Sequence, residues 1–320
     1  MYVATALNKK YVRYTGVMLL SLATNQLCHV DVYLLHSSLE EEDFSYLASC
    51  VSGHDISLHP LRVDPDNFPT GLPHTDQWSM ETYYRLLLLD LLPDSVARIL
   101  YLDSDLIVLK PLDDFYDMSL DGYDLISCVN ACGKNNPESY GPKHREMFAD
   151  AESAGFRYFC AGVTLFNIAR MREKYSFDTY LQAFQAWDYQ MEAPDQDILN
   201  WVHGSYAGYV DPYRYNLFAR IAHNDNMTCE DVKQRCSILH FAGDKPWEST
   251  NVHYDLEGLW WDYAKETPGY DSLLRDFLES SLRDNVRVEN YILALESENK
   301  QLQNRLLQAS DLLKRISGYQ

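Results

Sequence analysis

The feature that most constrains the fold is a short apolar segment that ends on two carboxylates. Residues 99–102 read Ile-Leu-Tyr-Leu, and Asp103, Ser104 and Asp105 follow them directly. An apolar run of this length is typical of a strand buried on both faces of a mostly parallel sheet. A carboxylate that loses water must be paired or must bind a metal, so these side chains do not serve packing.

Asp103 and Asp105 are two residues apart, so on a continuing strand both side chains would point to the same side. Two hard oxygen ligands on one side can share Mg2+ or Mn2+. In an open α/β sheet, ligands bind beyond the carboxyl ends of the strands. The segment therefore predicts a metal site that holds a phosphorylated substrate. The alternative is an ordinary turn, since Asp and Ser also bond to the backbone in turns.

Composition argues against several classes of function. The chain has 27 basic and 47 acidic residues and a formal net charge of −20. That charge disfavours nucleic-acid binding and docking on anionic lipid, which both need basic patches. No apolar run approaches the length of a transmembrane segment, and the seven cysteines match no zinc or haem pattern. The chain starts with an apolar strand rather than a signal peptide, so we expect a cytoplasmic protein with free thiols.

The order of the expected elements is typical of an α/β fold. Strands and helices alternate at residues 2–6, 12–25, 31–35, 38–51 and 56–63. This alternation predicts right-handed crossovers and a parallel sheet. Ser38 is expected to open the helix at 38–51 in a capping box with Glu41, and Ser79 to cap the helix at 80–91. Later elements are expected at 98–103, 124–129, 157–167, 173–187, from 194 onward, and at 236–243, with a polar excursion at 131–145.

The sequence changes character from about Leu278. Heptad a positions fall on Asn285, Ile292, Asn299, Leu306 and Leu313, and d positions on Val288, Leu295, Leu302, Ala309 and Ile316. This pattern predicts an amphipathic helix over 278–317 that forms a coiled coil and makes the protein a homo-oligomer, a dimer, with Asn299 setting the register. The alternative is one helix folded back on a catalytic domain at 1–270.

Four motifs join Leu102–Asp105 along the chain. They are residues 5–11 (Thr-Ala-Leu-Asn-Lys-Lys-Tyr), 158–163 (Tyr-Phe-Cys-Ala-Gly-Val), 195–199 (Asp-Gln-Asp-Ile-Leu) and 240–247 (His-Phe-Ala-Gly-Asp-Lys-Pro-Trp). Their order and spacing resemble glycosyltransferase family 8, which includes glycogenin and bacterial lipopolysaccharide galactosyl- and glucosyltransferases. The resemblance covers residues 1 to about 265 and not the C-terminal helix.

The resemblance implies a Rossmann-like GT-A fold, a UDP-sugar donor and Mn2+ or Mg2+ as cofactor. It implies transfer of glucose or galactose, with retention at the anomeric carbon, to a saccharide, glycolipid or glycoprotein acceptor such as lipopolysaccharide or another bacterial surface glycan. The implied metal ligands are Asp103, Asp105 and His240, a set that suits Mn2+ better than Ca2+.

The resemblance also assigns residues to the donor. Uracil and ribose would contact Ala6, Asn8 and Tyr11, and the phosphates would contact Gly243 and Lys245. Arg85 and Ser104 would lie near the donor, and its sugar would be lined by Ala161, Gly162, Asp195 and Gln196. Asp105, Asp195 and Gln196 would be catalytic. Because Gln is a poor nucleophile, the acceptor hydroxyl is expected to attack beside the leaving phosphate.

The sequence departs from the family at three positions. Many members have Asp where this chain has Asn8, Asn where it has Lys10, and Asn where it has Cys160. One alternative is a non-catalytic scaffold that keeps the fold as a binding surface. A haloacid-dehalogenase-like phosphatase also places two Asp after a strand, but it needs Thr or Val where Ile107 stands.

Overall fold

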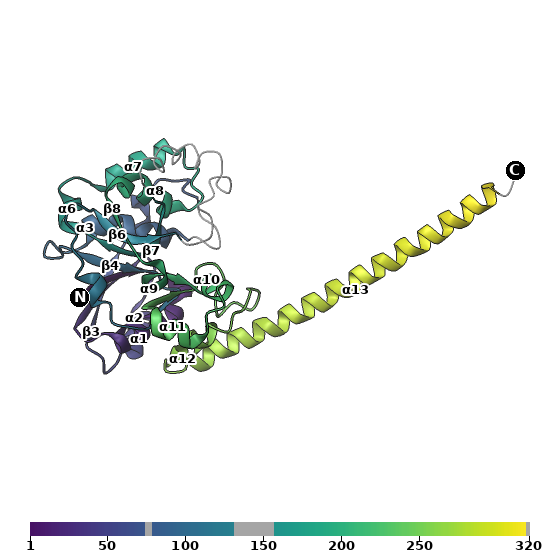
Figure 1. The fold of residues 1–320 in the computed structure, drawn as a ribbon, viewed down its shortest axis with the longest axis horizontal. Coiled ribbons are helices and arrows are strands. Elements are labelled where there is room, and N and C mark those ends of the chain that lie inside the picture. Colours follow the sequence, from purple (N-terminus) through teal and green to yellow (C-terminus); the bar gives the residue numbers. More distant parts are fainter. Residues whose placement is uncertain (74–78, 131–156, 318–320) are drawn as a thin grey trace. The chain divides into compact units, whose positions relative to one another are not determined.

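The computed structural model describes residues 1–73, 79–130 and 157–317 (Figure 1). The chain forms two compact units. The first comprises residues 1–246 and 253–270, and the second comprises residues 247–252 and the chain from 271 onward. None of the helices in the described ranges is both long and apolar enough to span a bilayer.

The first unit is built on a seven-stranded sheet in the order β3-β2-β1-β4-β7-β6-β8. The strands are β1 (Tyr2–Ala6), β2 (Val30–His36), β3 (Ile56–Arg62), β4 (Ile99–Leu102), β6 (Leu125–Val129), β7 (Phe159–Phe166) and β8 (Ala207–Val210). Strand β7 is antiparallel to its neighbours β4 and β6, and the other adjacent pairs are parallel. The expected α/β fold with a mostly parallel sheet is confirmed.

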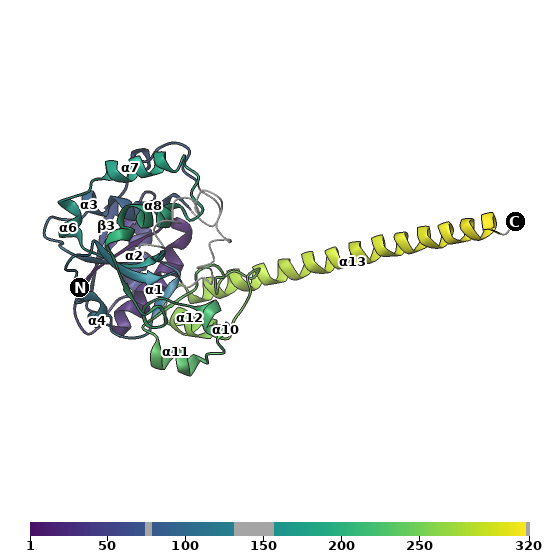
Figure 2. The same ribbon diagram turned by 45° about the horizontal axis from the view of Figure 1, so that its top comes forward.

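Helices cover both faces of this sheet (Figures 1 and 2). Because successive side chains of a strand point to opposite faces, the strands supply two separate hydrophobic cores. One core joins the sheet to α1 (Val12–Asn25), α2 (Glu41–Cys50) and α4 (Asp113–Tyr116). The other joins it to η3 (Met80–Leu87), α3 (Leu88–Leu91), α6 (Ile168–Arg172), α7 (Phe177–Ala186) and α8 (Pro194–His203).

A small second sheet brings a remote segment to the end of β4. Its order is β5-β10-β9, with β5 (Leu106–Val108), β10 (Ile238–His240) and β9 (Leu217–Phe218). Strand β10 runs antiparallel to β5, which places His240 opposite Leu106. His240 therefore lies beside Asp105, which precedes β5. The remaining short helices of this unit are η1 (Lys9–Tyr11), η2 (Pro65–Asn67), η5 (Gly204–Tyr206), α9 (Pro212–Tyr215), α10 (Ala219–Asn224), α11 (Cys229–Arg235) and α12 (Glu257–Ala264).

Three local predictions are corrected. Helix α2 begins after Glu40, not Ser38, because the side chains of Glu40 and Asp43 close the capping box on each other's backbone N–H. The helix expected at 173–187 begins only at Phe177, where Ser176 caps it. The helix expected at 80–91 is a 3₁₀ helix as far as Leu87, and the Ser79 side chain makes no capping bond. The excursion expected at 131–145 lies outside the described residues.

The second unit consists mainly of helix α13 (Tyr270–Ser317), which is 48 residues long. The long helix expected from Leu278 is therefore present and begins earlier. Three leucines of the predicted coiled-coil seam are solvent-exposed: Leu295 is 46% exposed, Leu302 58% and Leu306 74%.

Candidate active site

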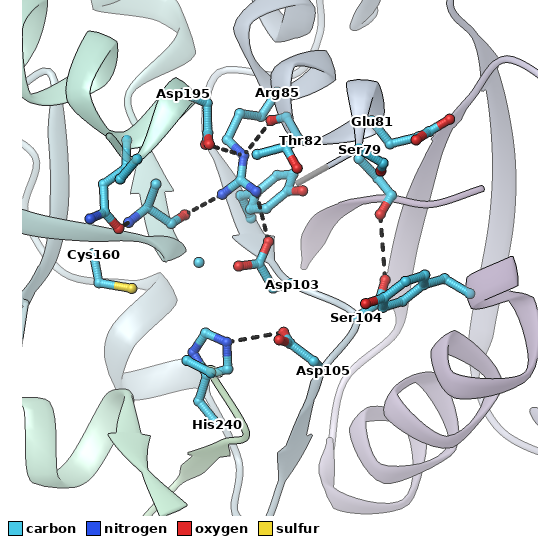
Figure 3. Close-up of a pocket in the computed structure, with 18 of the residues that line it drawn as sticks. Ser79, Glu81, Thr82, Arg85, Asp103, Ser104, Asp105, Cys160, Asp195 and His240 are labelled. Atoms are coloured by element: carbon cyan, nitrogen blue, oxygen red, sulfur yellow. Dashed lines mark hydrogen bonds and ion pairs between the residues drawn. The ribbon is translucent and has the colours of Figure 1, made fainter. Parts of the chain in front are cut away.

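Every residue that the sequence analysis assigned to the metal or the donor lines one cavity of about 540 Å³ in the first unit. Figure 3 shows part of this lining, with Arg85, Asp103 and His240 among the labelled residues. The cavity lies at the carboxyl ends of β1 and β4, where an open α/β sheet binds its ligands. Lys10 and Cys160, two positions at which the sequence departs from the family, also line the cavity. The other lining residues are Leu7, Ser79, Glu81, Thr82, Tyr101, Asn130, Ala193, Pro194, Phe218, Arg220 and Ala242.

Asp103 and Asp105 belong to a turn, not to one continuing strand. Strand β4 ends at Leu102 and β5 begins at Leu106 in the other sheet. The Asp103 N–H donates to the Gly162 carbonyl oxygen at 2.9 Å, and the Asp105 carbonyl oxygen accepts from the Phe241 N–H at 2.8 Å. The predicted strand geometry was therefore wrong. Both carboxylates still face the cavity, because each residue is tied to a different sheet.

The Ser104 hydroxyl anchors this turn to the sheet and to helix α1. This hydroxyl is buried, accepts from Thr15 Oγ1 at 3.0 Å and lies 3.3 Å from Thr5 Oγ1. These partners belong to β1 and α1, so the turn is fastened to the body of the sheet. The Ser104 side chain is thus engaged with hydroxyls of the protein.

His240 is oriented by a partner on each side. Its Nε2 lies 3.0 Å from Asp105 Oδ1, and its Nδ1 lies 2.8 Å from Asn216 Oδ1. In the tautomer in which Nδ1–H donates to Asn216 Oδ1, the Nε2 lone pair is available to a metal ion. The edge of the His240 ring packs against the Phe218 ring, 5.2 Å between centroids.

Lys245 closes the same side of the cavity. Its ammonium forms an ion pair with Asp105 Oδ2 and donates to the Phe241 carbonyl oxygen at 3.0 Å. Burial raises the pKa of Asp105, but Lys245 and His240 outweigh burial and hold that pKa well below its usual range. Gly243, between His240 and Lys245, has φ +93°, a conformation that favours glycine.

Gly162 lies where β7 bulges toward the two acids. The register of β6 and β7 jumps from Ser127↔Thr164 to Cys128↔Cys160. The buried Ser127 hydroxyl fits inside the bulge, 2.7 Å from the Cys160 carbonyl oxygen and 2.8 Å from that of Val163. Gly162 thus lies within a β-bulge, and the Asp103 carboxylate and the His240 ring approach it closely.

Arg85 holds the opposite wall together. Its guanidinium is 5% exposed and donates to Asp103 Oδ1 and to the Ala161 carbonyl oxygen, each at 2.8 Å. It also stacks on the Tyr101 ring, 4.1 Å from the centroid. Burial lowers the pKa of Arg85, but the Asp103 and Asp195 carboxylates outweigh burial and raise it. Arg85 therefore forms its ion pairs in the interior and not on a helix surface.

Asp195 and Gln196 enter the cavity from the first turn of α8. Asp195 Oδ2 lies 2.9 Å from Arg85 Nε, but the Nε–H bonds to the Thr82 carbonyl oxygen at 3.1 Å. Asp195 Oδ2 is buried and accepts no hydrogen bond from the described residues. Burial raises the pKa of Asp195 to about 6, more than Arg85 lowers it. Gln196 Oε1 accepts from the Ala161 N–H at 3.0 Å.

Asn8 forms the far corner of the cavity with two residues of the η3 segment. Its Oδ1 accepts from the Tyr11 N–H at 3.2 Å and so caps η1. Its Nδ2 lies 3.1 Å from Glu81 Oε2 and 3.4 Å from Ser79 Oγ. The Asn8 amide is therefore committed to protein partners on both of its polar atoms.

The sequence profile of Glycosyl transferase family 8 matches residues 2–251. The chain belongs to glycosyltransferase family 8. Among its relatives, a putative glycosyltransferase of Haemophilus influenzae is 23% identical over 298 residues, which cover 86% of each chain. The lipopolysaccharide 1,2-glucosyltransferase of Escherichia coli K12 is 24% identical over 258 residues, 78% of this chain and 74% of the relative.

Solved structures agree on the fold of this family 8 glycosyltransferase. The galactosyltransferase LgtC, crystallised with donor and acceptor sugar analogs, superposes with a TM-score of 0.69 at 21% identity. The match covers 84% of this chain and 96% of that one. The GT-A fold is confirmed, and family membership argues against the phosphatase alternative.

The candidate metal ligands of the site fit a divalent cation. The candidate ligand atoms of Asp103, Asp105 and His240 lie within 4.8 Å of one another, close enough to share one ion. Asp105 Oδ1 and His240 Nε2, two of these atoms, lie 3.0 Å apart. Two carboxylates with an imidazole suit Mn2+ better than Ca2+, which takes oxygen ligands.

Sequence reasoning missed several residues that this family 8 site depends on. Asn216 contacts His240, which lies 24 residues further along the chain. Ser127 contacts Cys160, which lies 33 residues further along. Glu81 was absent from the candidates although it lies two residues after Ser79. Only the position of Glu81, four residues before Arg85, could have drawn attention to it. Nothing in the sequence marks Asn216 or Ser127.

Proposed function

We propose that the protein is a metal-dependent, retaining glycosyltransferase that moves glucose or galactose from a UDP-sugar to a saccharide or glycoconjugate acceptor. The observation that carries this proposal is the meeting of Asp103, Asp105 and His240 from two sheets in one cavity. Arg85 and Asp195 on the opposite wall supply the polar surface that a sugar needs. A cation bound by the three ligands, Mn2+ or Mg2+, would neutralise charge on the departing UDP.

The donor would lie along the cavity from Tyr11 to Asp195. The uracil would stack on Tyr11, with ribose near Ala6 and the turn at Ser104. Lys245 would place its ammonium beside the phosphates as a point charge. The phosphates could also approach the backbone at Gly243, because a Cβ built there meets nothing within 4 Å and the turn has the φ of +93° that favours glycine.

The donor sugar would lie against Ala161, Gly162, Asp195 and Gln196. The buried Asp195 Oδ2 can accept a hydrogen bond from a sugar hydroxyl, which supports a role in positioning the donor sugar. The Gln196 carbonyl oxygen is held by the Ala161 N–H, which orients the side-chain NH2 group but gives no nucleophile. Catalysis would then come from positioning and charge stabilisation.

The transfer step would take place on one face of the sugar. The acceptor hydroxyl oxygen bonds to the anomeric carbon as the bond from that carbon to the phosphate oxygen breaks. The released phosphate oxygen takes the hydroxyl proton, so UDP leaves and configuration is retained. Arg85 would hold Asp103 and Asp195 in place through this step, since it contacts both.

Separate observations support the class of acceptor, the cytoplasmic location of the protein and its self-association. A relative named as a lipopolysaccharide 1,2-glucosyltransferase supports a glycolipid or another surface glycan as acceptor. The six cysteines of the described residues are free thiols, which agrees with a reducing cytoplasm. We also propose that α13 joins two chains, because seam leucines on it are exposed.

Donor hydrolysis tests the proposal. With Mn2+, the protein should slowly release UDP from UDP-glucose or UDP-galactose, with water replacing the acceptor. Asp105→Asn should abolish release and leave the circular dichroism spectrum unchanged, whereas Asp114→Asn, an exposed position, should release UDP normally. Silence with every nucleotide sugar would favour the scaffold alternative.

A further inference from the structure

We propose that Glu81 reads the base of the donor, by accepting the N3–H of uracil, and so selects uridine nucleotides. The inference rests on the proposed function, which places the base on Tyr11. Glu81 lines the same cavity as Tyr11 and Asn8, and its carboxylate is half-buried. It was not among the residues that the sequence assigned to the donor.

Both N–H donors of Asn8 are engaged by the protein, and its carbonyl oxygen already accepts one hydrogen bond, so Asn8 keeps a single neutral acceptor site. A side-chain amide has two N–H donors on one nitrogen. The two partners of Asn8 Nδ2 are Glu81 Oε2 at 3.1 Å and Ser79 Oγ at 3.4 Å. Its Oδ1 accepts from the Tyr11 N–H at 3.2 Å. Asn8 thus acts as a positioning residue that holds Glu81 in this corner.

Glu81 keeps capacity for a ligand. An ionised carboxylate has two oxygens and about four acceptor sites. The bond from Asn8 uses one site on Oε2, and Asn8 itself also bonds to the Tyr11 N–H. Glu81 also opens the η3 segment, in the same helix as Arg85, so the base corner and the metal corner share one rigid element.

The chemistry of the base decides what this carboxylate selects. Uracil presents N3–H, a donor, whereas cytosine presents a lone pair at N3. A carboxylate accepts N3–H in a charge-assisted hydrogen bond and repels the cytosine lone pair. Attraction to one base and repulsion of the other both favour uridine.

The test compares binding of UDP, CDP and N3-methyl-UDP to the full chain at a fixed Mn2+ concentration, by isothermal titration calorimetry. Wild type should prefer UDP, and methylation of N3 should remove the preference. Glu81→Ala should weaken UDP binding by about 10- to 100-fold, the cost of a hydrogen bond to a charged group, and strengthen CDP binding, because the repulsion of the cytosine lone pair is removed. Glu81→Gln keeps an oxygen for Asn8 and offers an N–H to the base, so it should shift preference toward CDP.

Glu42→Gln is the matched control, because Glu42 is exposed on α2 and does not line the cavity. Equal losses for UDP and CDP in Glu81→Ala, or an unchanged ratio in both Glu81 variants, would overturn the assignment to Glu81 and leave the proposed function intact. A wild-type protein that binds none of the three nucleotides would overturn both. Unchanged thermal unfolding in each variant confirms that the differences arise in the site.

Discussion

A Cβ atom on Gly162 would lie 2.4 Å from Asp103 Oδ2 and 2.7 Å from His240 Cε1. Both distances are shorter than any real van der Waals contact, and both neighbours belong to the candidate metal site. The absence of a side chain at residue 162 is therefore what allows a carboxylate from one sheet and an imidazole from the other to converge.

Gly162→Ala should disable metal binding without unfolding the protein. The added methyl group must push Asp103 or His240 aside, and ligand displacement of this kind costs about 10- to 100-fold in affinity. Mn2+ binding followed by electron paramagnetic resonance measures the loss. Gly258→Ala is the control, since a Cβ there meets nothing within 4 Å. Equal Mn2+ affinity in the two variants would show that the site tolerates the methyl group.

Asn216→Ala should weaken Mn2+ binding by about 10- to 100-fold through His240 alone. Asn216 is 1% exposed, and its Oδ1 is the partner that fixes His240 Nδ1 at 2.8 Å. Asn216→Asp keeps an acceptor at this position and should retain most of the affinity. The comparison separates orientation of the imidazole from general destabilisation, because both variants disturb the same buried position. Equal weakening in both would contradict the orienting role.

Arg85→Met should lower the free energy of unfolding by about 3 to 5 kcal/mol, because it leaves the buried Asp195 and the partly buried Asp103 without their cation. Arg85→Lys should recover only part of this, since an ammonium cannot reproduce the planar fork that contacts Asp103 and the Ala161 carbonyl oxygen. Urea unfolding measures both. Arg214→Lys should change little, because Arg214 pairs with Asp114 at the surface, where the side chains are 45% and 73% exposed.

The central sheet could be predicted from sequence because its strands are short apolar runs with clear breakers. Asp103, Asp105 and His240 could be found because their residue types carry metal chemistry and stand in recognisable motifs. The turn at Asp103 could not be predicted, because two Asp residues separated by one residue are compatible with a strand and with a turn. The second sheet decided between them, and the pairing of β5 with β10 depends on residues more than 100 positions apart.

The residues that orient the candidate ligands could not be predicted, for a different reason. Asn216, Ser127 and Glu81 are ordinary polar residues whose roles depend on which atoms approach them in three dimensions. The 3₁₀ helix at Met80–Leu87 was not predicted, because helix propensity alone does not distinguish a 3₁₀ helix from an α-helix. Local sequence could therefore point to the candidate metal ligands, whereas the residues that orient them required the structure.

Asp195 should make stability depend on pH. Its folded pKa is about 6, against an ordinary 3.8, because burial disfavours the charge. The folded state therefore holds the proton more tightly than the unfolded state. This contribution is fully present below about pH 4, is lost as pH rises through about 6, and amounts to about 3 kcal/mol. Asp195→Asn should remove it. Urea unfolding at pH 4.5 and pH 7 should show a smaller difference between the two pH values in the variant; an equal difference would contradict the assignment.

Substitution in the predicted seam of α13 should reduce the mass of the protein in solution. Leu302 occupies a d position and is 58% exposed in the single chain, so Leu302→Glu would place a charge inside a coiled coil. Leu293 is 62% exposed on the same helix but occupies a b position, outside the seam. Light scattering should therefore give half the wild-type mass for Leu302→Glu and the full mass for Leu293→Glu. If wild type and both variants are monomers, the exposed leucines of α13 serve something other than self-association.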